Sequence, residues 1–232
     1  MTVILQARMS SQRLPGKVLA RVQNKSLLEF TIERLKQSIY IGDIIVATST
    51  EKSDDPVAQY CRSNKIEVFR GELDNVAARF KAVIEQDGLS SFIRISGDSP
   101  LIDSHIIDAG IEMFENNSYD IVTNVLNRTF PKGQSFEIFR SETFLREFSN
   151  IRTAEEQEHV TKYFYKNKDR FNIFNLECIS GNFSHVNLSI DTKEDFSRFE
   201  ALINDRSRPV CDLGWDEIMK LYKALDQHEC TN

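Results

Sequence analysis

The first two-thirds of the chain alternate short apolar runs with segments of helical periodicity, which constrains the fold more than any other feature. The runs, typical of buried strands, lie at residues 3–5, 44–47, 67–69, 92–95 and 121–122. Helical stripes separate them: Leu28, Ile32, Leu35 and Ile39; Val57, Tyr60 and Cys61; Val76, Phe80, Val83 and Ile84; Ile107, Ile111 and Phe114. Because such units join by right-handed crossovers, the order predicts an α/β fold with a mostly parallel sheet and helices on both faces.

The pattern changes after Asn124. We expect strands at residues 136–139, 173–178 and 186–190, and helices at residues 141–148, 153–167, 192–202 and 215–225. Thr153 with Glu156 reads as a capping box, Thr192 as a helix cap, and Asp55 as the cap before Pro56. No linker, repeat or low-complexity tract interrupts the chain, so we expect a single domain over residues 1–232.

Composition narrows the function. The 232 residues, 41% hydrophobic, suffice for one sizeable core, and no apolar run approaches the roughly 20 residues that span a bilayer. The first apolar run is too short for a signal peptide and arginine follows it, so we expect a cytoplasmic protein. Four scattered cysteines without a Cys-x-x-Cys pair predict free thiols. The net charge of −6 argues against general nucleic-acid binding.

A basic loop follows the first strand. It carries Arg8, Arg13 and Lys17 with small residues and Gly16, and it is a local exception in an acidic chain. Backbone N–H groups and cations at a strand's carboxyl end commonly hold phosphate, although the Walker pattern is absent. The alternative is a solvated basic turn.

Asp98 stands where a central buried strand ends. Gly97 before it permits close approach of backbone or ligand, and Pro100 stops the strand. Ligands of open α/β sheets bind beyond the strand carboxyl ends, and Mg²⁺ typically takes one or two carboxylates there. Asp98 is therefore a candidate Mg²⁺ ligand, the alternative being a turn aspartate. Asp103 reads as the cap of the next helix.

Asp191 is the second candidate carboxylate. It follows the apolar run at residues 186–190 and precedes Thr192. If its strand neighbours that of Asp98, both carboxylates face one crevice with Arg8 and Lys17. The alternative, that Asp191 only begins the turn before the cap, is left open by spacing.

These residues together resemble the cytidylyltransferase family that makes CMP-activated sugar acids, and most closely its spore-coat polysaccharide branch. The likeness covers most of the chain. It rests on residues 6–17, Phe69-Arg-Gly71, residues 94–103, Arg128-Thr-Phe-Pro131, Glu158-His-Val-Thr161 and Ser189-Ile-Asp-Thr192. Each motif is weak alone, but their order is specific.

The resemblance implies a Rossmann-like, nucleotide-diphosphosugar-transferase-like fold. It implies CTP as the nucleotide, a sugar or sugar acid as acceptor, Mg²⁺ as cofactor, and surface polysaccharide or glycan biosynthesis as the setting. Residues 1–124 would form the nucleotide-binding half, residues 125–185 the acceptor and dimerisation elaboration, and the chain a homodimer. The implied site residues are Arg8, Lys17 and Asp98 for catalysis, Gln6, Ala7, Arg13 and Gly97 for the nucleotide, and Asp98 and Asp191 for the metal.

Three residues are candidates for the acceptor. Glu137 matches the family pattern, although Ser135 stands where the family often has aspartate. Arg70 follows a short strand and reaches the nucleotide or the acceptor, or is a surface arginine. His159 contacts the acceptor or a second subunit, or is a structural histidine paired with Glu155 one helical turn earlier.

Other functions of the same crevice remain open. They are guanylyl or uridylyl transfer to a sugar 1-phosphate, glycosyl transfer from a nucleotide sugar, and a non-catalytic nucleotide-binding scaffold. No Gly-x-Ser-x-Gly nucleophile motif is present. The joint presence of Arg8, Lys17, Asp98 and Asp191 counts against the scaffold.

Overall fold

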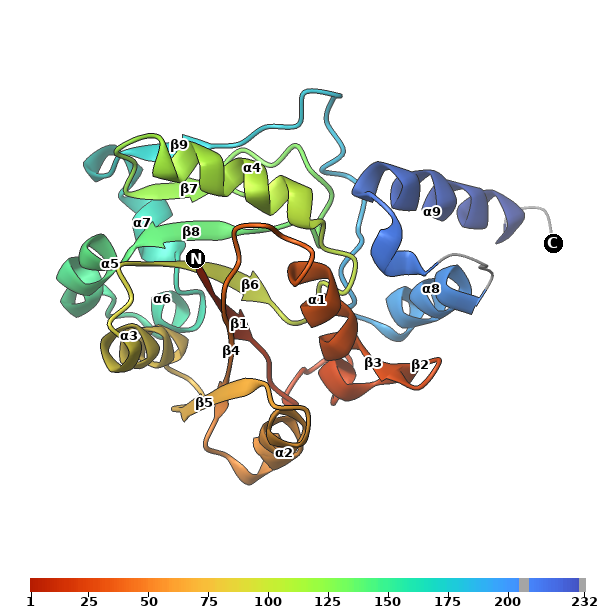
Figure 1. Cartoon of the computed structure of the whole chain (residues 1–232), viewed down its shortest axis with the longest axis horizontal. Helices are drawn as coiled ribbons and strands as arrows, with labels where there is room; N and C mark the ends of the chain where they lie inside the picture. Colours follow the sequence, from red (N-terminus) through yellow and green to blue (C-terminus); the bar gives the residue numbers. More distant parts are fainter. Residues whose placement is uncertain (205–208, 230–232) are drawn as a thin grey trace.

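A seven-stranded sheet forms the centre of the molecule (Figure 1). The computed structural model describes residues 1–204 and 209–229. The strand order is β5-β4-β1-β6-β8-β7-β9. The strands are β1 Thr2–Gln6, β4 Ile44–Ser49, β5 Glu67–Gly71, β6 Ser91–Ser96, β7 Ile121–Thr123, β8 Glu137–Arg140 and β9 Ile173–Asn175. Strand β8 runs antiparallel to both β6 and β7, and the other pairs are parallel, which confirms the mostly parallel α/β sheet.

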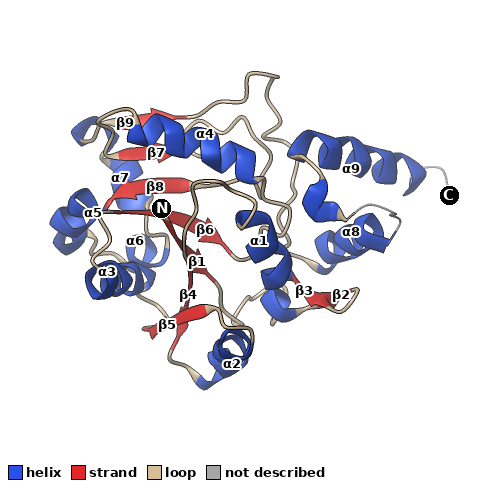
Figure 2. Cartoon of the chain, in the orientation of Figure 1, coloured by secondary structure: helices blue, strands red, loops and turns tan. Residues whose placement is uncertain are grey.

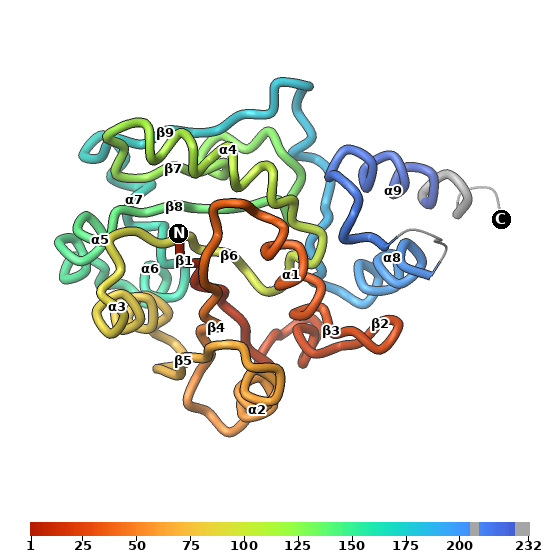
Figure 3. The backbone as a smooth tube through the Cα atoms, in the orientation of Figure 1, coloured from red at the N-terminus to blue at the C-terminus, as the bar shows by residue number. Residues whose placement is uncertain are grey.

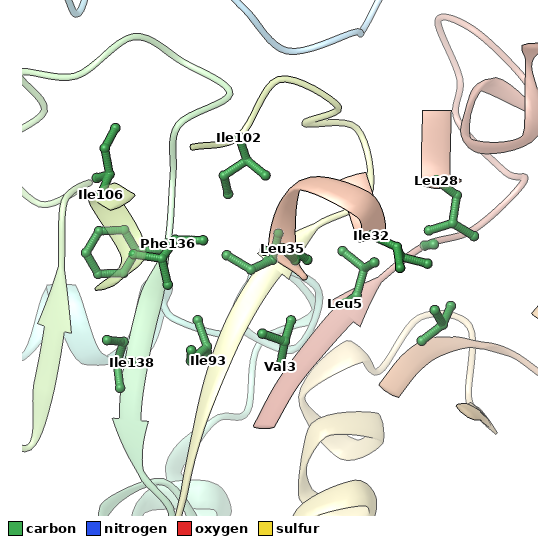
Figure 4. Packing of buried hydrophobic residues seen from close by; sticks show 14 of the residues in the cluster. Val3, Leu5, Leu28, Ile32, Leu35, Ile93, Ile102, Ile106, Phe136 and Ile138 are labelled. Atoms are coloured by element: carbon green, nitrogen blue, oxygen red, sulfur yellow. The ribbon is translucent and has the colours of Figure 1, made fainter. Parts of the chain in front are cut away.

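Helices cover both faces of this sheet (Figure 2). One face carries α1 Leu27–Leu35, α2 Asp55–Ser63 and α4 Ser104–Glu115, and the other carries α3 Val76–Asp87, α5 Ser141–Glu147, α6 Ala154–Glu158 and α7 Lys162–Lys166. Alternation along β1 sorts its side chains between them. Val3 and Leu5 pack under α1 (Figure 4), whereas Ile4 joins an opposite layer rich in phenylalanine. Both faces are thus buried, as the apolar runs predict.

A separate pair of helices lies beside the sheet. After β9 the backbone crosses to helices α8 Lys193–Asn204 and α9 Trp215–Glu229 (Figure 3). They enclose an apolar cluster in which the rings of Phe30 and Phe199 meet edge to face at 5.3 Å. A short hairpin, β2 Arg21–Val22 and β3 Lys25–Ser26, contributes Val22 to the cluster. No helix of the described segments is long and apolar enough to span a membrane.

Three predicted elements are wrong in extent. Residues 186–190 form no sheet strand; Asn187 makes an isolated bridge to Lys132. The helix expected at residues 153–167 breaks between α6 and α7, where Val160 has a φ of 20°. The capping box of Thr153 and Glu156 that opens α6 is confirmed. Strand β9 ends at Asn175, short of the predicted end at Cys178. The Leu176 amide still donates to the Thr123 carbonyl, but the Cys178 amide donates to the Thr129 side chain.

Two local predictions are also corrected. Helix α1 ends at Leu35, so Ile39 does not extend its apolar stripe and is 81% exposed. Asp54, not Asp55, stands at the cap position of α2. Asp103 caps α4 as predicted, accepting from the His105 amide at 2.9 Å. The described cysteines Cys61, Cys178 and Cys211 are free, and Cys230 lies outside the described residues.

Candidate active site

A cleft of about 730 Å³ opens at the carboxyl ends of β1 and β6. It lies where the topology of an open α/β sheet predicts a ligand. Its lining is Gln6, Ala7, Arg8, Ser10, Ser11, Gln12, Arg13, Lys17, Val18, Leu73, Asp74, Ser96, Asp98, Glu158 and His159. The basic loop after β1 therefore forms one wall of a cavity.

Lys17 joins the two candidate carboxylates. Its Nζ donates to Asp98 Oδ2 at 3.0 Å, to Asp191 Oδ1 at 2.9 Å and to the carbonyl of Ile190 at 2.7 Å. The lysine is 7% exposed, so these contacts satisfy all three of its N–H donors away from bulk water. Two carboxylates far apart in sequence thus converge on a single ammonium group.

Asp191 reaches this point without the predicted strand. The Ile190 amide donates to the Asp98 carbonyl at 2.9 Å, and the Leu188 amide donates to the Lys132 carbonyl at 2.8 Å. The Asp191 carboxylate faces cations, while Asp195 takes the turn bonds by accepting from the Asp191 and Thr192 amides. Asp195 thus makes the turn bonds, and a metal-binding role for Asp191 stays a prediction.

Lys132 is a site-proximal cation that sequence reasoning missed. Its Nζ donates to Asp191 Oδ2 at 2.7 Å, and Arg13 Nη2 lies 3.1 Å from the same oxygen. Burial raises the pKa of Asp191, but hydrogen bonds from Lys132 and Lys17 outweigh it and hold that pKa well below its ordinary value. The one sequence signal for Lys132 is its place directly after the Arg128-Thr-Phe-Pro131 motif.

Gly133 keeps this arrangement closely packed. It has a φ of +95°, and a Cβ there would lie 2.6 Å from the backbone of both Leu188 and Ser189. We expect Gly133→Ala to destabilise the protein by about 1–3 kcal/mol and to displace the segment that carries Asp191. Urea unfolding measures the loss. The control is Gly88→Ala, which shares a positive φ but meets no atom within 4 Å, so an equal loss in both would contradict the clash.

Gly97 and the end of β1 make the predicted close approach. The Gly97 amide donates to the Gln6 carbonyl at 2.8 Å, and a Cβ on Gly97 would lie 3.0 Å from that oxygen and 3.1 Å from Ala7 Cβ. Gln6, Ala7 and Asp98 line the cleft, while Gly97 contacts Gln6 and Ala7 and is not part of the lining. A nucleotide contact for these three residues stays a prediction.

Arg8 and His159 both line the cleft, Arg8 from the loop after β1 and His159 from the end of α6. Arg8 Nη2 donates to Glu158 Oε1 at 2.7 Å, and this bond lowers the pKa of Glu158. His159 is exposed at the end of α6, and the Glu155 carboxylate expected to pair with it binds Lys162 instead. His159 therefore lines the cavity with no ion pair to Glu155.

Two of the candidate acceptor residues stand apart from the cavity lining. Arg70 binds Asp55 at 2.7 Å and donates to the Ser49 carbonyl at 2.8 Å, on the side of β4 and β5. Glu137 is 3% exposed and binds Arg94 and the hydroxyl of Tyr165.

A buried polar network nevertheless links Glu137 to the cleft. Arg94, its partner, also reaches Gln6 Oε1 at 3.4 Å. Burial and the Glu137 charge raise the pKa of Tyr165 well above its ordinary value, so its hydroxyl stays protonated and donates to Glu137. Glu137 is therefore connected to the cleft through Arg94 and Gln6 and does not itself line it.

The chain is similar to proteins of known family over nearly its whole length. A family model described as cytidylyltransferase matches residues 2–229. The spore coat polysaccharide biosynthesis protein SpsF of Bacillus subtilis is 34% identical over 206 residues, which are 86% of this chain and 84% of SpsF.

Solved structures share the fold. A cytidylyltransferase from Leptospira borgpetersenii superposes with a TM-score of 0.91 at 30% identity, covering 97% of this chain and 95% of that one. A CMP:2-keto-3-deoxy-manno-octonic acid synthetase complexed with CTP superposes with a TM-score of 0.67 at 17% identity, covering 88% and 98%. The expected nucleotidyltransferase fold is confirmed.

Proposed function

Because the chain belongs to the cytidylyltransferase family, we propose that it transfers a cytidylyl group from CTP to a sugar-type acceptor in a Mg²⁺-dependent reaction. The observation that carries the proposal is the convergence of Lys17, Asp98 and Asp191 in a cleft lined by a basic loop. Spore-coat polysaccharide synthesis by a relative and the CTP complex of a structural neighbour point to the nucleotide and the setting. A structural neighbour that makes the CMP derivative of a sugar acid favours a sugar acid as the acceptor class.

The proposed reaction is an in-line displacement. An acceptor oxygen forms a bond to the α-phosphorus, the bond from that phosphorus to the bridging oxygen breaks, and pyrophosphate leaves. The protein contributes position and charge neutralisation, for which Arg8, Arg13 and Lys17 are placed along one wall of the cleft. The proton of the acceptor hydroxyl passes to solvent or to a neighbouring base.

The carboxylates fit a magnesium ion. Asp98 and Asp191 each place an oxygen within 3.0 Å of the same cation, and Mg²⁺ typically uses one or two carboxylates with phosphate oxygens and water. No group of three His, Cys, Asp or Glu ligands exists within residues 1–204 and 209–229, so substrate oxygens would complete the coordination. The ion would neutralise charge on the triphosphate.

Nucleotide binding would change which anions the cations of the site pair with. Lys17, Lys132 and Arg13 now neutralise Asp191, and Lys17 also neutralises Asp98. A triphosphate offers these cations a denser anion, which frees the carboxylates for the metal. We therefore expect the nucleotide and the metal to bind together.

Pyrophosphate release tests the function. CTP, GTP, UTP and ATP are each incubated with Mg²⁺ and a panel of sugar acids and sugar 1-phosphates. Release with CTP and a sugar acid is the expected result. Release only from GTP or UTP with a sugar 1-phosphate would replace the proposal with another nucleotidyl transfer, and nucleotide binding without any release would favour the scaffold. The homodimer and the cytoplasmic location also stay predictions, and sedimentation and cell fractionation test them.

Asp191→Ala separates the two roles of that residue. As a metal ligand, its loss should raise the Mg²⁺ concentration for half-maximal rate and lower the maximal rate. As a turn residue, its loss should cost only stability, of order 1 kcal/mol. A Mg²⁺ titration of initial rate, run beside urea unfolding of the same variant, decides. A Mg²⁺ curve that overlays wild type would leave Asp98 as the metal carboxylate.

A further inference from the structure

The basic loop between β1 and Lys17 is closed at one residue. The carbonyl of Met9 accepts from the amides of Ser11 and Gly16, both at 2.9 Å. Gly16 has a φ of 75°, a left-handed conformation that glycine adopts readily and that lets the chain return to Met9. Met9 follows Arg8 directly, and Lys17 follows Gly16, so the backbone of Met9 fixes the relative placement of two candidate phosphate ligands.

Met9 is tied to the neighbouring strand by Asp54. The Met9 amide donates to Asp54 Oδ1 at 2.6 Å. Asp54 Oδ2 accepts from the amide of Ser49 at 3.1 Å and from its hydroxyl, and Ser49 is the last residue of β4. Three donors thus converge on one carboxylate, which makes the bonds charge-assisted and stronger than those between neutral groups.

Helix capping does not explain this carboxylate. Asp54 holds the cap position of α2, yet its side chain makes no capping bond. It is fully buried, which is costly for a charged group unless hydrogen bonds satisfy it. Arg79 supplies a favourable charge nearby, and it donates to the carbonyls of Glu72 and Leu73, the second of which lines the cleft.

We propose that Asp54 is the positioning residue of the phosphate-binding loop. It holds the amide of Met9 and thereby sets the placement of Arg8 and Lys17, without touching the nucleotide itself. The inference rests on the proposed function, because it assumes that this loop binds the triphosphate. Asp54 acts on binding through the backbone, whereas Asp98 and Asp191 act through their own oxygens.

Two variants test this role. Asp54→Ala removes all three bonds. Asp54→Asn keeps the shape but has one acceptor oxygen and no charge, so it cannot accept from both the Met9 and Ser49 amides. The matched control is Asp120→Asn, at the opposite edge of the sheet, where the carboxylate accepts from the Thr143 hydroxyl at 2.5 Å and the Asn172 amide at 2.9 Å. All three should lose stability, so stability alone is not the readout.

The first readout is local. Two rates are measured: amide hydrogen exchange in peptides spanning residues 6–18, and cleavage of the folded protein by trypsin after Arg13. Both rates should rise about tenfold in both Asp54 variants, the size expected for one lost charge-assisted bond. Asp120→Asn should leave both unchanged. Exchange at wild-type rates in Asp54→Asn, the variant that keeps the side chain's shape, would overturn the proposal that Asp54 holds the loop in place.

The second readout is inorganic tripolyphosphate, which tests phosphate binding without a base. Its Kd should rise about tenfold in the Asp54 variants and stay unchanged in Asp120→Asn. A loosened loop with wild-type tripolyphosphate affinity would overturn the positioning role while leaving the proposed function intact. A wild-type protein that binds neither tripolyphosphate nor CTP would overturn the proposed function, whatever the exchange data report.

Discussion

Asp98→Asn is expected to lower the rate of nucleotidyl transfer by about 100- to 1000-fold, the range found when one group that stabilises transition-state charge is removed. The amide preserves the shape of the carboxylate and removes its charge. Folding should survive, because Lys17 keeps Asp191 and the Ile190 carbonyl as partners. Initial rates and the melting temperature are measured on the same preparation.

The control for Asp98→Asn is Asp103→Asn, five residues further along the same connection. The Asp103 carboxylate accepts from the amides of His105 at 2.9 Å and Trp215 at 2.8 Å, so its loss should lower the melting temperature and leave the rate close to wild type. Wild-type activity in folded Asp98→Asn would remove the carboxylate from the reaction.

Lys17→Ala and Arg8→Ala are expected to weaken CTP binding by about 10- to 100-fold and CMP binding much less. The two cations should face the β and γ phosphates, where charge is densest and where pyrophosphate leaves, and a charge-assisted bond contributes about 1.5–3 kcal/mol. Isothermal titration with both nucleotides measures the difference. Lys25→Ala is the control, since Lys25 pairs with Glu33 at 2.7 Å outside the cleft.

Equal losses for CTP and CMP would mean that the loop contacts the base, the ribose or the α-phosphate instead. The Lys17 variant carries a second effect that the Arg8 variant lacks. Without the ammonium, Asp98 and Asp191 lose the cation that they share, so urea unfolding should report a loss of stability. Mg²⁺ should restore part of it if both carboxylates bind the metal.

The order of strands and helices was readable from the sequence because each period is local. A run such as residues 92–95 lies in β6, and the stripe from Val76 to Ile84 lies on α3. The failures occurred where tertiary contacts replaced the local pattern. Residues 186–190 have the composition of a strand, yet they lie against Lys132 and Asp98 rather than in the sheet.

The candidate site divides in the same way. Arg8, Lys17 and Asp98 follow strands, and parallel strands deliver their ends to one edge, so their meeting in one cleft was predictable. Lys132 and Asp54 were not predicted. Their importance comes from partners dozens of residues away, namely Asp191 for the lysine and Met9 for the aspartate, and no periodicity encodes such pairs.

The sequence by itself determined the fold class, the two buried faces of the sheet and the end of the sheet where polar loops gather. Hydrophobic periodicity decides these features, since it records which side of each element avoids water. Only the tertiary structure decided which charges share a partner. It brought Asp191 to Lys17 outside any strand, buried Glu137 against Arg94 and Tyr165, and fixed Met9 through Asp54. Those contacts depend on distances of about 3 Å between distant segments, which packing sets and composition does not.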